Sequence, residues 1–151
     1  MADDLTADDE RLLRRAFALA RFARSRGDGP YGSICSRSGY VILEGENTQE
    51  STSDPTCHAE MNLIRKLVKE FTPAQIDEFT VYASTEPCPM CAGALVVAGI
   101  KRLVYGASAG RAAELTGSPL AMDSRAIFQA LGAPIEVLGP VLEDEALQVL
   151  A

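Results

Sequence analysis

The residues DPTCHAE at positions 54–60 and TEPCPMCAGAL at positions 85–95 each stand at the expected start of a helix. Cys88 and Cys91 are three residues apart, so in the first turn of a helix both thiols lie on one side and can bind a single ion. The positive end of the helix dipole also favours their thiolate forms. His58 is the only histidine in the chain and therefore the one imidazole that can join them. One imidazole and two thiolates leave the fourth position of a tetrahedral zinc ion open to water, as in catalytic zinc sites.

Glu60 is the candidate proton carrier beside this ion. In a regular helix its side chain would point about 200° away from that of His58, so both reach one site only if His58 occupies the irregular first turn. The two thiolates neutralise the ion, which leaves the carboxylate free to accept a proton from bound water, whose pKa zinc lowers from about 15.7 to near 7. The ordinary alternative is an acid that only complements the helix dipole.

The other two cysteines are assigned to packing. Cys57 is adjacent to His58, which makes joint coordination of one ion awkward, and Cys35 lies within a predicted strand where a small buried residue fits. If either side chain filled the fourth position, the zinc site would be structural.

The flanking sequence predicts an α/β fold. Asp8 is the expected N-cap of a first helix, whose 3.6-residue apolar period ends at Gly27 and Gly29. A hairpin, a polar loop over residues 46–56, a helix from near His58 and two more strands separated by a helix follow, so the sheet is expected to be mixed. The strands are expected at Tyr31–Arg37, Tyr40–Gly45, Phe79–Ser84 and Lys101–Tyr105, with a helix at Met90–Gly99 before the last of them.

Beyond Gly106 the pattern weakens. Short helices are expected at Arg111–Leu115 and Ser124–Leu131, a strand at Ile135–Leu138 and a closing helix at Glu143–Leu150. No repeat or linker divides the chain, so residues 1–151 are expected to form a single domain.

Composition limits the class of partner. The 151 residues carry a formal net charge of −7, which disfavours a phosphate backbone. Six arginines between Arg11 and Arg26 mostly lie opposite the apolar side of the first helix and indicate a solvated face rather than an RNA-binding one. The longest apolar stretch, Ala92–Ile100, is about half the length that a bilayer requires, and no secretory signal is expected. We therefore expect a cytoplasmic protein, no membrane and reduced cysteines.

The two opening motifs, together with GPYGS at residues 29–33 and the loop at Asn47, resemble the cytidine deaminase-like superfamily from roughly Arg11 to Gly106. Within it the chain is similar to the branch of guanine deaminases and tRNA-specific adenosine deaminases. The resemblance implies a three-layer α/β/α fold with a mixed central sheet of about five strands flanked by helices. It also implies deamination of a nucleobase-like ring with release of ammonia.

The resemblance assigns one zinc ion per chain to His58, Cys88 and Cys91, with a water or hydroxide as fourth ligand. Glu60 would take the proton from that water and pass it to the ring nitrogen and then to the departing ammonia. Members of this branch commonly form dimers, so a homodimer is expected by resemblance.

Three positions are expected, by the same resemblance, to bind the substrate. Asn47 and the backbone N–H of Ala59 would hold polar atoms of the base, and Tyr31 would line the pocket. The ordinary alternatives are a loop-capping amide for Asn47 and a core aromatic for Tyr31.

Guanine deaminases also use a later acid to move protons to the leaving amine. Asp123 aligns with that position and Glu114 is the other candidate, although each has the ordinary alternative of a helix cap or surface acid. The chain departs from the branch because no aromatic residue follows Phe128, whereas those enzymes close the pocket with a C-terminal aromatic.

The expected substrate is a free base, nucleoside or related aminoheterocycle such as a guanine, cytosine-type or aminotriazine ring. A tRNA adenosine deaminase is the first alternative, but its C-terminal basic residues are missing here, because no Lys or Arg follows Arg125. Two further alternatives are a non-catalytic module that zinc only stabilises and a thiol redox role for Cys88 and Cys91.

Overall fold

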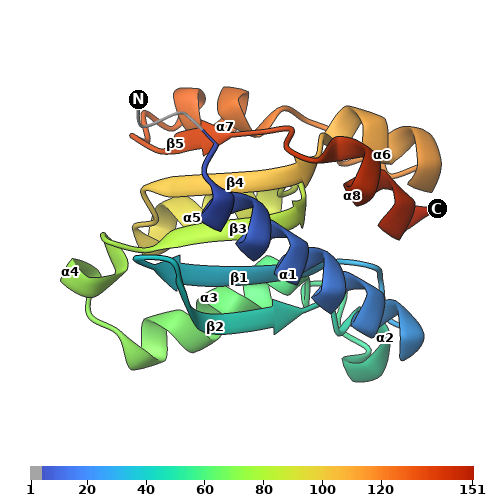
Figure 1. Cartoon of the computed structure of the whole chain (residues 1–151), viewed down its shortest axis with the longest axis horizontal. Helices are drawn as coiled ribbons and strands as arrows, with labels where there is room; N and C mark the ends of the chain where they lie inside the picture. Colours follow the sequence, from blue (N-terminus) through green and yellow to red (C-terminus); the bar gives the residue numbers. More distant parts are fainter. Residues whose placement is uncertain (1–4) are drawn as a thin grey trace.

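The computed structural model describes residues 5–151, so residues 1–4 of the predicted domain lie outside the described part. Eight helices and five strands make up this part of the chain, and Figure 1 shows how they are arranged. Their bounds are α1 Ala7–Ser25, β1 Gly32–Arg37, β2 Tyr40–Glu46, α2 Gln49–Thr52, α3 Ala59–Glu70, α4 Pro73–Ile76, β3 Thr80–Thr85, α5 Pro89–Ala98, β4 Arg102–Ala107, α6 Ala109–Thr116, α7 Ser124–Ala130, β5 Glu136–Leu138 and α8 Glu143–Leu150.

The strands form one mixed sheet in the order β2-β1-β3-β4-β5. Strand β1 pairs antiparallel with both β2 and β3, whereas β3, β4 and β5 run parallel to one another. Helix α5 makes the crossover that the parallel pair β3 and β4 requires. The mixed sheet predicted from the sequence is confirmed.

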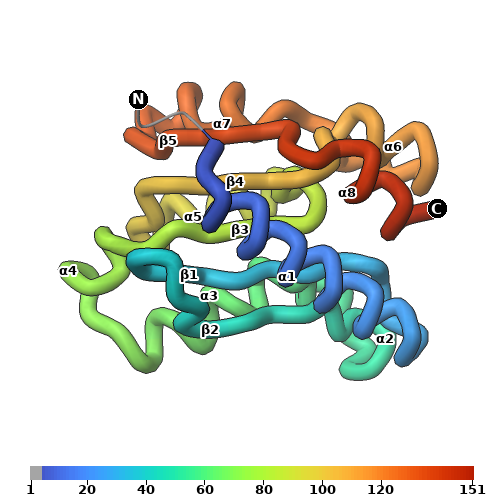
Figure 2. The backbone as a smooth tube through the Cα atoms, in the orientation of Figure 1, coloured from blue at the N-terminus to red at the C-terminus, as the bar shows by residue number. Residues whose placement is uncertain are grey.

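Helices cover both faces of this sheet, which gives three layers (Figures 1 and 2). Helices α1 and α8 pack on one face, over a core that includes Ile34, Tyr82 and Val104. Helices α3, α5 and α7 pack on the other, over Val81 and Leu103. Neighbouring residues of β1, β3 and β4 therefore enter opposite cores, as the period of two in a strand requires.

Two glycines allow helices to lie against the sheet. A Cβ atom at Gly32 would lie 2.4 Å from the Ala16 carbonyl oxygen of α1, and one at Gly45 would lie 2.5 Å from the Ala59 carbonyl oxygen of α3. Because these neighbours are backbone atoms, a side chain at either position would push a helix away from the sheet. Gly45 thereby sets the position of the first turn of α3, where the functional residues gather.

The predicted N-cap of the first helix was wrong. Thr6, and not Asp8, caps α1, and its hydroxyl accepts from the Asp9 N–H at 3.0 Å while the Asp9 carboxylate accepts from the Thr6 N–H at 3.1 Å. The same carboxylate accepts from Tyr82 Oη at 2.6 Å and from Arg102 at 3.0 Å. These long-range partners favour the earlier start of the helix.

Two short helices differ from the sequence expectation. The segment predicted as a loop over residues 46–56 contains the single turn α2. Helix α4 was not predicted, although Thr72 and Gln75 form a capping box around Pro73 at its start. One turn of helix carries too little periodicity to be recognised in a sequence. No helix of residues 5–151 has both the length and the apolar composition that crossing a bilayer requires.

Candidate metal centre and active site

The two motifs meet at the starts of α3 and α5. His58 is the N-cap of α3 and Cys88 is the N-cap of α5, and both have an extended backbone, with ψ of 158° and 170°. Cys91 follows in the first turn of α5. Because His58 precedes the helical residues, its side chain is free of the angular separation that a regular helix would impose between it and Glu60.

The three predicted ligands lie together. His58 Nδ1 is 3.5 Å from the sulfur of Cys88 and 3.5 Å from that of Cys91. The three donor atoms all lie within 4.8 Å of one another, close enough to bind one ion. One imidazole nitrogen and two sulfurs form a donor set that fits zinc with one position left over.

The other cysteines are not part of this group of donor atoms. Cys35 is buried in β1, and burial raises the pKa of its thiol to about 11. Cys57 is half-buried, and its sulfur lies 3.8 Å from Arg65 Nη1.

The thiols and the imidazole influence one another strongly. Hydrogen bonding from the Cys91 thiol, and secondarily from His58, lowers the pKa of Cys88 to about 4 despite its burial. The hydrogen bond to Cys88 raises the pKa of His58, and the same contact between the thiols raises that of Cys91. These contacts favour the thiolate form of Cys88 over that of Cys91, and a divalent cation held between them would favour deprotonation of the second thiol.

Glu60 is buried beside these ligands in the first turn of α3. Burial is the main reason that its pKa is raised to about 7, and the nearby Cys88 charge adds to the effect. A carboxyl group whose pKa lies near neutrality both accepts and releases protons readily. An adjacent divalent cation would favour its ionised form.

His58, Glu60 and Cys88 line a cavity of about 260 Å³. On one side, the cavity wall consists of mostly small and largely apolar side chains from α6 and the segment after it. The lining residues are Tyr31, Gln49, His58, Glu60, Thr85, Glu86, Cys88, Ala109, Ala112, Ala113, Thr116, Ser118, Leu120 and Ala121.

The predicted substrate-binding residues occupy different places relative to this cavity. Tyr31 lines it, and Ala59 lies in the first turn of α3, where N–H groups have no partner within the helix. Asn47 is fully buried and is not among the lining residues, whereas Gln49, which sequence reasoning did not single out, is.

The two acids considered for late proton transfer lie outside the lining. Asp123 is exposed and is the N-cap of α7, where its carboxylate accepts from the Arg125 N–H at 2.9 Å. Glu114 is exposed on α6. Neither borders the cavity, so a role in proton transfer stays a prediction for each of them.

Glu86 is a site residue that sequence reasoning missed. Its buried carboxylate accepts from the Ala109 N–H at 2.8 Å, from the Ser124 N–H at 2.7 Å and from the Ser124 hydroxyl at 2.5 Å. Glu86 thus fastens the starts of α6 and α7 to the strand end that leads to Cys88. The available signal was an acid standing just before a metal-binding motif.

The comparisons with known proteins agree with this geometry. Residues 6–107 match the cytidine and deoxycytidylate deaminase zinc-binding region. A probable cytosine deaminase of Schizosaccharomyces pombe is 35% identical over 149 residues, covering 95% of this chain and 91% of the relative. A guanine deaminase of Bacillus subtilis is 38% identical over 128 residues, covering 84% of this chain and 79% of the relative.

A tRNA-specific adenosine deaminase of Haemophilus influenzae is 41% identical over 101 residues, covering 66% of this chain and 58% of the relative. A solved guanine deaminase structure from Bacillus subtilis superposes with a TM-score of 0.65 at 34% identity, covering 83% of this chain and 76% of that one. With its helix-start His and Cys residues beside a buried glutamate, the chain belongs to the family that shares the cytidine and deoxycytidylate deaminase zinc-binding region, and it is a deaminase, a hydrolase that acts on C–N bonds of cyclic amidines.

Proposed function

We propose that this deaminase acts on an uncharged small aminoheterocycle, a free base or nucleoside of the guanine, cytosine or aminotriazine type. The observation that carries the proposal is the charge of the cavity wall. Among the residues described, the cavity lining includes the acids Glu60 and Glu86 but no Lys or Arg. A phosphorylated substrate would therefore find no cation in the cavity to pair with its phosphate.

In the proposed reaction, water replaces an exocyclic amino group of the ring, and ammonia leaves. Zinc held by His58, Cys88 and Cys91 would lower the pKa of a water molecule from about 15.7 to near 7. Glu60 accepts a proton from the water, delivers it to the neighbouring ring nitrogen, and then carries a second proton to the departing amine. Its burial beside the ligands keeps bulk water from competing for these protons.

The polar edge of the ring is proposed to bind at Asn47 and at the backbone N–H of Ala59, with Tyr31 against its plane. Tyr31 supports this arrangement because it already borders the cavity. The Tyr31 carbonyl oxygen also accepts from the Asn47 N–H at 3.1 Å, so the two residues are held at a fixed spacing.

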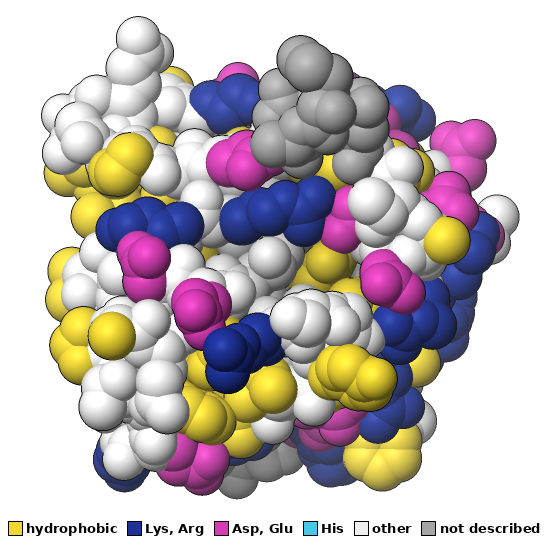
Figure 3. All heavy atoms as spheres, turned by 60° about the vertical axis from the view of Figure 1, so that its left-hand side comes forward, with side chains coloured by type: hydrophobic (Ala, Val, Ile, Leu, Met, Phe, Trp, Pro, Cys, Tyr) yellow, Lys and Arg dark blue, Asp and Glu magenta, His cyan; other side chains and the backbone are white. Residues whose placement is uncertain are grey.

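The contacts of the first helix argue against RNA as the substrate. Its arginines are largely paired within the chain, through bonds of Arg11 to Gly39, Arg14 to Glu145, Arg15 to Glu44, Arg24 to Val149 and Arg26 to Glu46. On the face shown in Figure 3, several Lys and Arg side chains likewise have acidic side chains beside them. A phosphate backbone would have to break these pairs.

The protein is also proposed to be a cytoplasmic homodimer that pairs through α5. This helix is apolar along its whole length, yet Val97 is 89% exposed, and Val68 on the neighbouring α3 is 50% exposed. Burial of this face in a second copy would remove apolar surface from water. Sedimentation should show a dimer, and Val97→Glu should dissociate it. A monomeric wild type would overturn the proposal.

An ammonia-release screen of the zinc-loaded protein tests the substrate. The panel is guanine, adenine, cytosine, ammeline, their available nucleosides and a tRNA anticodon stem-loop. We expect turnover of a guanine-type ring without RNA. Turnover of the stem-loop alone, with affinity that falls steeply as salt rises, would favour the tRNA alternative instead.

A further inference from the structure

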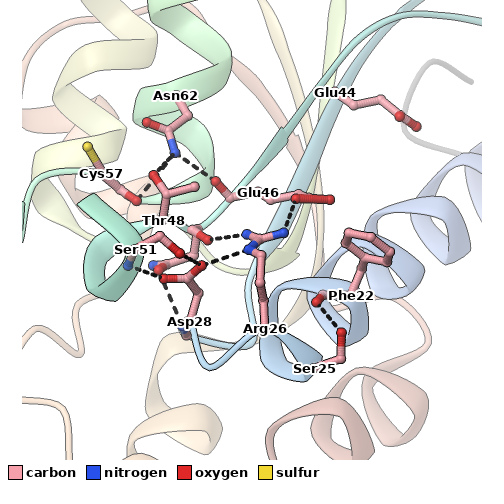
Figure 4. Close-up of polar contacts among 12 residues, drawn as sticks. Phe22, Ser25, Arg26, Asp28, Glu44, Glu46, Thr48, Ser51, Cys57 and Asn62 are labelled. Atoms are coloured by element: carbon pink, nitrogen blue, oxygen red, sulfur yellow. Dashed lines mark hydrogen bonds and ion pairs between the residues drawn. The ribbon is translucent and has the colours of Figure 1, made fainter. Parts of the chain in front are cut away.

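The side chain of Asn62 on α3 bridges the two ends of the segment between β2 and α3. Asn62 Nδ2 donates to the Glu46 carbonyl oxygen at 2.7 Å and to Thr48 Oγ1 at 2.9 Å, and lies 3.5 Å from the Cys57 carbonyl oxygen. The Thr48 N–H also donates to the Cys57 carbonyl oxygen at 3.0 Å. Figure 4 shows the contacts of Asn62 with Glu46, Thr48 and Cys57. The two ends of the segment are therefore fixed relative to the metal ligand that follows Cys57.

A second anchor comes from the turn after α1 (Figure 4). Asp28 accepts from the Ser51 N–H at 2.8 Å and from its hydroxyl at 2.5 Å. Arg26 donates to Asp28 at 2.9 Å, to Glu46 at 2.7 Å and to the Asn47 carbonyl oxygen at 3.0 Å. The backbone on both sides of Asn47 is thus tied to the body of the protein.

The side chain of Asn47 has a defined orientation within this frame. Its Oδ1 accepts from the Gly29 N–H at 3.3 Å and from the Gln49 N–H at 3.0 Å. Because backbone N–H groups can only donate, Nδ2 must point the other way and serve as a donor. One of its two N–H groups is already used, since Nδ2 donates to Gln49 Oε1 at 2.6 Å.

Gln49 stands between Asn47 and the cavity. It lines the cavity, whereas Asn47 is 0% exposed. The orientation of the Gln49 amide is fixed as well, because its Nε2 donates to the Pro55 carbonyl oxygen at 3.2 Å. In this arrangement the Gln49 side-chain oxygen accepts the Asn47 bond that a ring in the cavity would otherwise accept.

We propose that Gln49 is a specificity-determining residue. When no substrate is bound, its side-chain oxygen accepts the hydrogen bond from Asn47 Nδ2. An acceptor atom of the substrate takes over this bond when the ring binds. The proposal rests on the proposed function, because it needs Asn47 to bind the ring. A ring that presents an acceptor at this edge restores the hydrogen bond that displacement of Gln49 breaks. A ring without one leaves a buried donor unpaired and is rejected.

Substitutions at Gln49 should shift KM in opposite directions. Gln49→Met keeps the side-chain volume but removes the competing oxygen, so KM for guanine should fall by about 2- to 10-fold, the equivalent of one neutral hydrogen bond. Gln49→Glu gives up the bond to the Pro55 carbonyl oxygen but offers Asn47 a charged acceptor, and should raise KM by about 10-fold. Glu50→Gln, an exposed charge change on the same short helix, is the control. Shifts of both Gln49 variants in one direction, or no shift, would overturn the proposal.

A readout without turnover separates this proposal from the choice of substrate. In the zinc-loaded protein without substrate, exchange of the Asn47 side-chain amide protons with solvent should be about 10-fold faster in Gln49→Ala than in wild type or Glu50→Gln, because the cover is lost. Equal exchange rates of the Asn47 amide protons in wild type and Gln49→Ala would contradict the role proposed for Gln49, even if guanine is deaminated. Faster exchange in Gln49→Ala, in a protein that deaminates none of the rings tested, would support the shielding of Asn47 by Gln49 and contradict the proposed substrate.

Discussion

Replacement of Glu86 by Gln tests the connection that joins the metal-binding strand end to the cavity wall. The carboxylate accepts three hydrogen bonds, one from Ala109 and two from Ser124, and it is buried. A glutamine keeps one acceptor oxygen. Its NH2 group replaces the other oxygen and faces an N–H group that also can only donate. At least one charge-assisted bond is lost in the interior.

The magnitude follows from the number and kind of these bonds. Loss of a hydrogen bond to a charged group costs about 1.5–3 kcal/mol, and a buried N–H left unpaired adds to this. We expect Glu86→Gln to lower the free energy of unfolding by about 2–4 kcal/mol, which corresponds to a fall in Tm of about 5–15 °C for a chain of this size. KM should rise as well, because α6 carries Ala109 and Ala112 of the cavity wall.

Urea denaturation of the zinc-loaded protein measures the effect. Glu114→Gln is the matched control, because it makes the same change on the exposed surface of α6 and should alter stability by less than about 0.5 kcal/mol. Ser124→Ala, which removes only the hydroxyl bond, should cost about 1–3 kcal/mol. Equal stability of Glu86→Gln and Glu114→Gln would show that the carboxylate does not hold the two helices.

Three further outcomes are expected. Burial raises the pKa of Asp9, but bonds to Arg102 and Tyr82 outweigh it and lower that pKa to about 2, below the 3.8 of an unfolded chain. The resulting stabilisation of about 2 kcal/mol is present above about pH 4 and is lost as pH falls through about 2, so urea titrations should show Asp9→Asn weakened at pH 7 but much less near pH 2. Ala113→Phe should fill the cavity and raise KM by about 10-fold with zinc content unchanged; an unaltered KM would place the ring elsewhere. Asp123→Ala should lower the unfolding free energy by about 1 kcal/mol through loss of the α7 cap, and a fall in kcat of about 100-fold or more would instead support its predicted role in proton transfer.

The metal ligands were accessible to sequence reasoning because their signals are local. His58, Cys88 and Cys91 stand at helix starts, and the spacing of the cysteines already places two sulfurs on one side of a turn. Their meeting across the fold required only the order of helices and strands, which the apolar periods of the longer elements indicate.

The features that were missed depend on distant partners. Glu86 is held by residues 23 and 38 positions further along the chain, and Asp9 by a residue 93 positions away. No local pattern distinguishes such acids from surface ones. The cover that Gln49 places over Asn47 likewise depends on the single turn α2, which is too short to leave a period in the sequence.

Ammonia release from guanine and zinc content, both compared between wild type and Glu60→Gln, test the zinc-dependent deamination most directly. We predict one zinc per chain in both proteins and a kcat about 100- to 10,000-fold lower in the variant, because the amide cannot carry protons between water, ring and leaving group. A variant that binds zinc and releases ammonia at the wild-type rate, or an active wild type that contains no zinc, would contradict it.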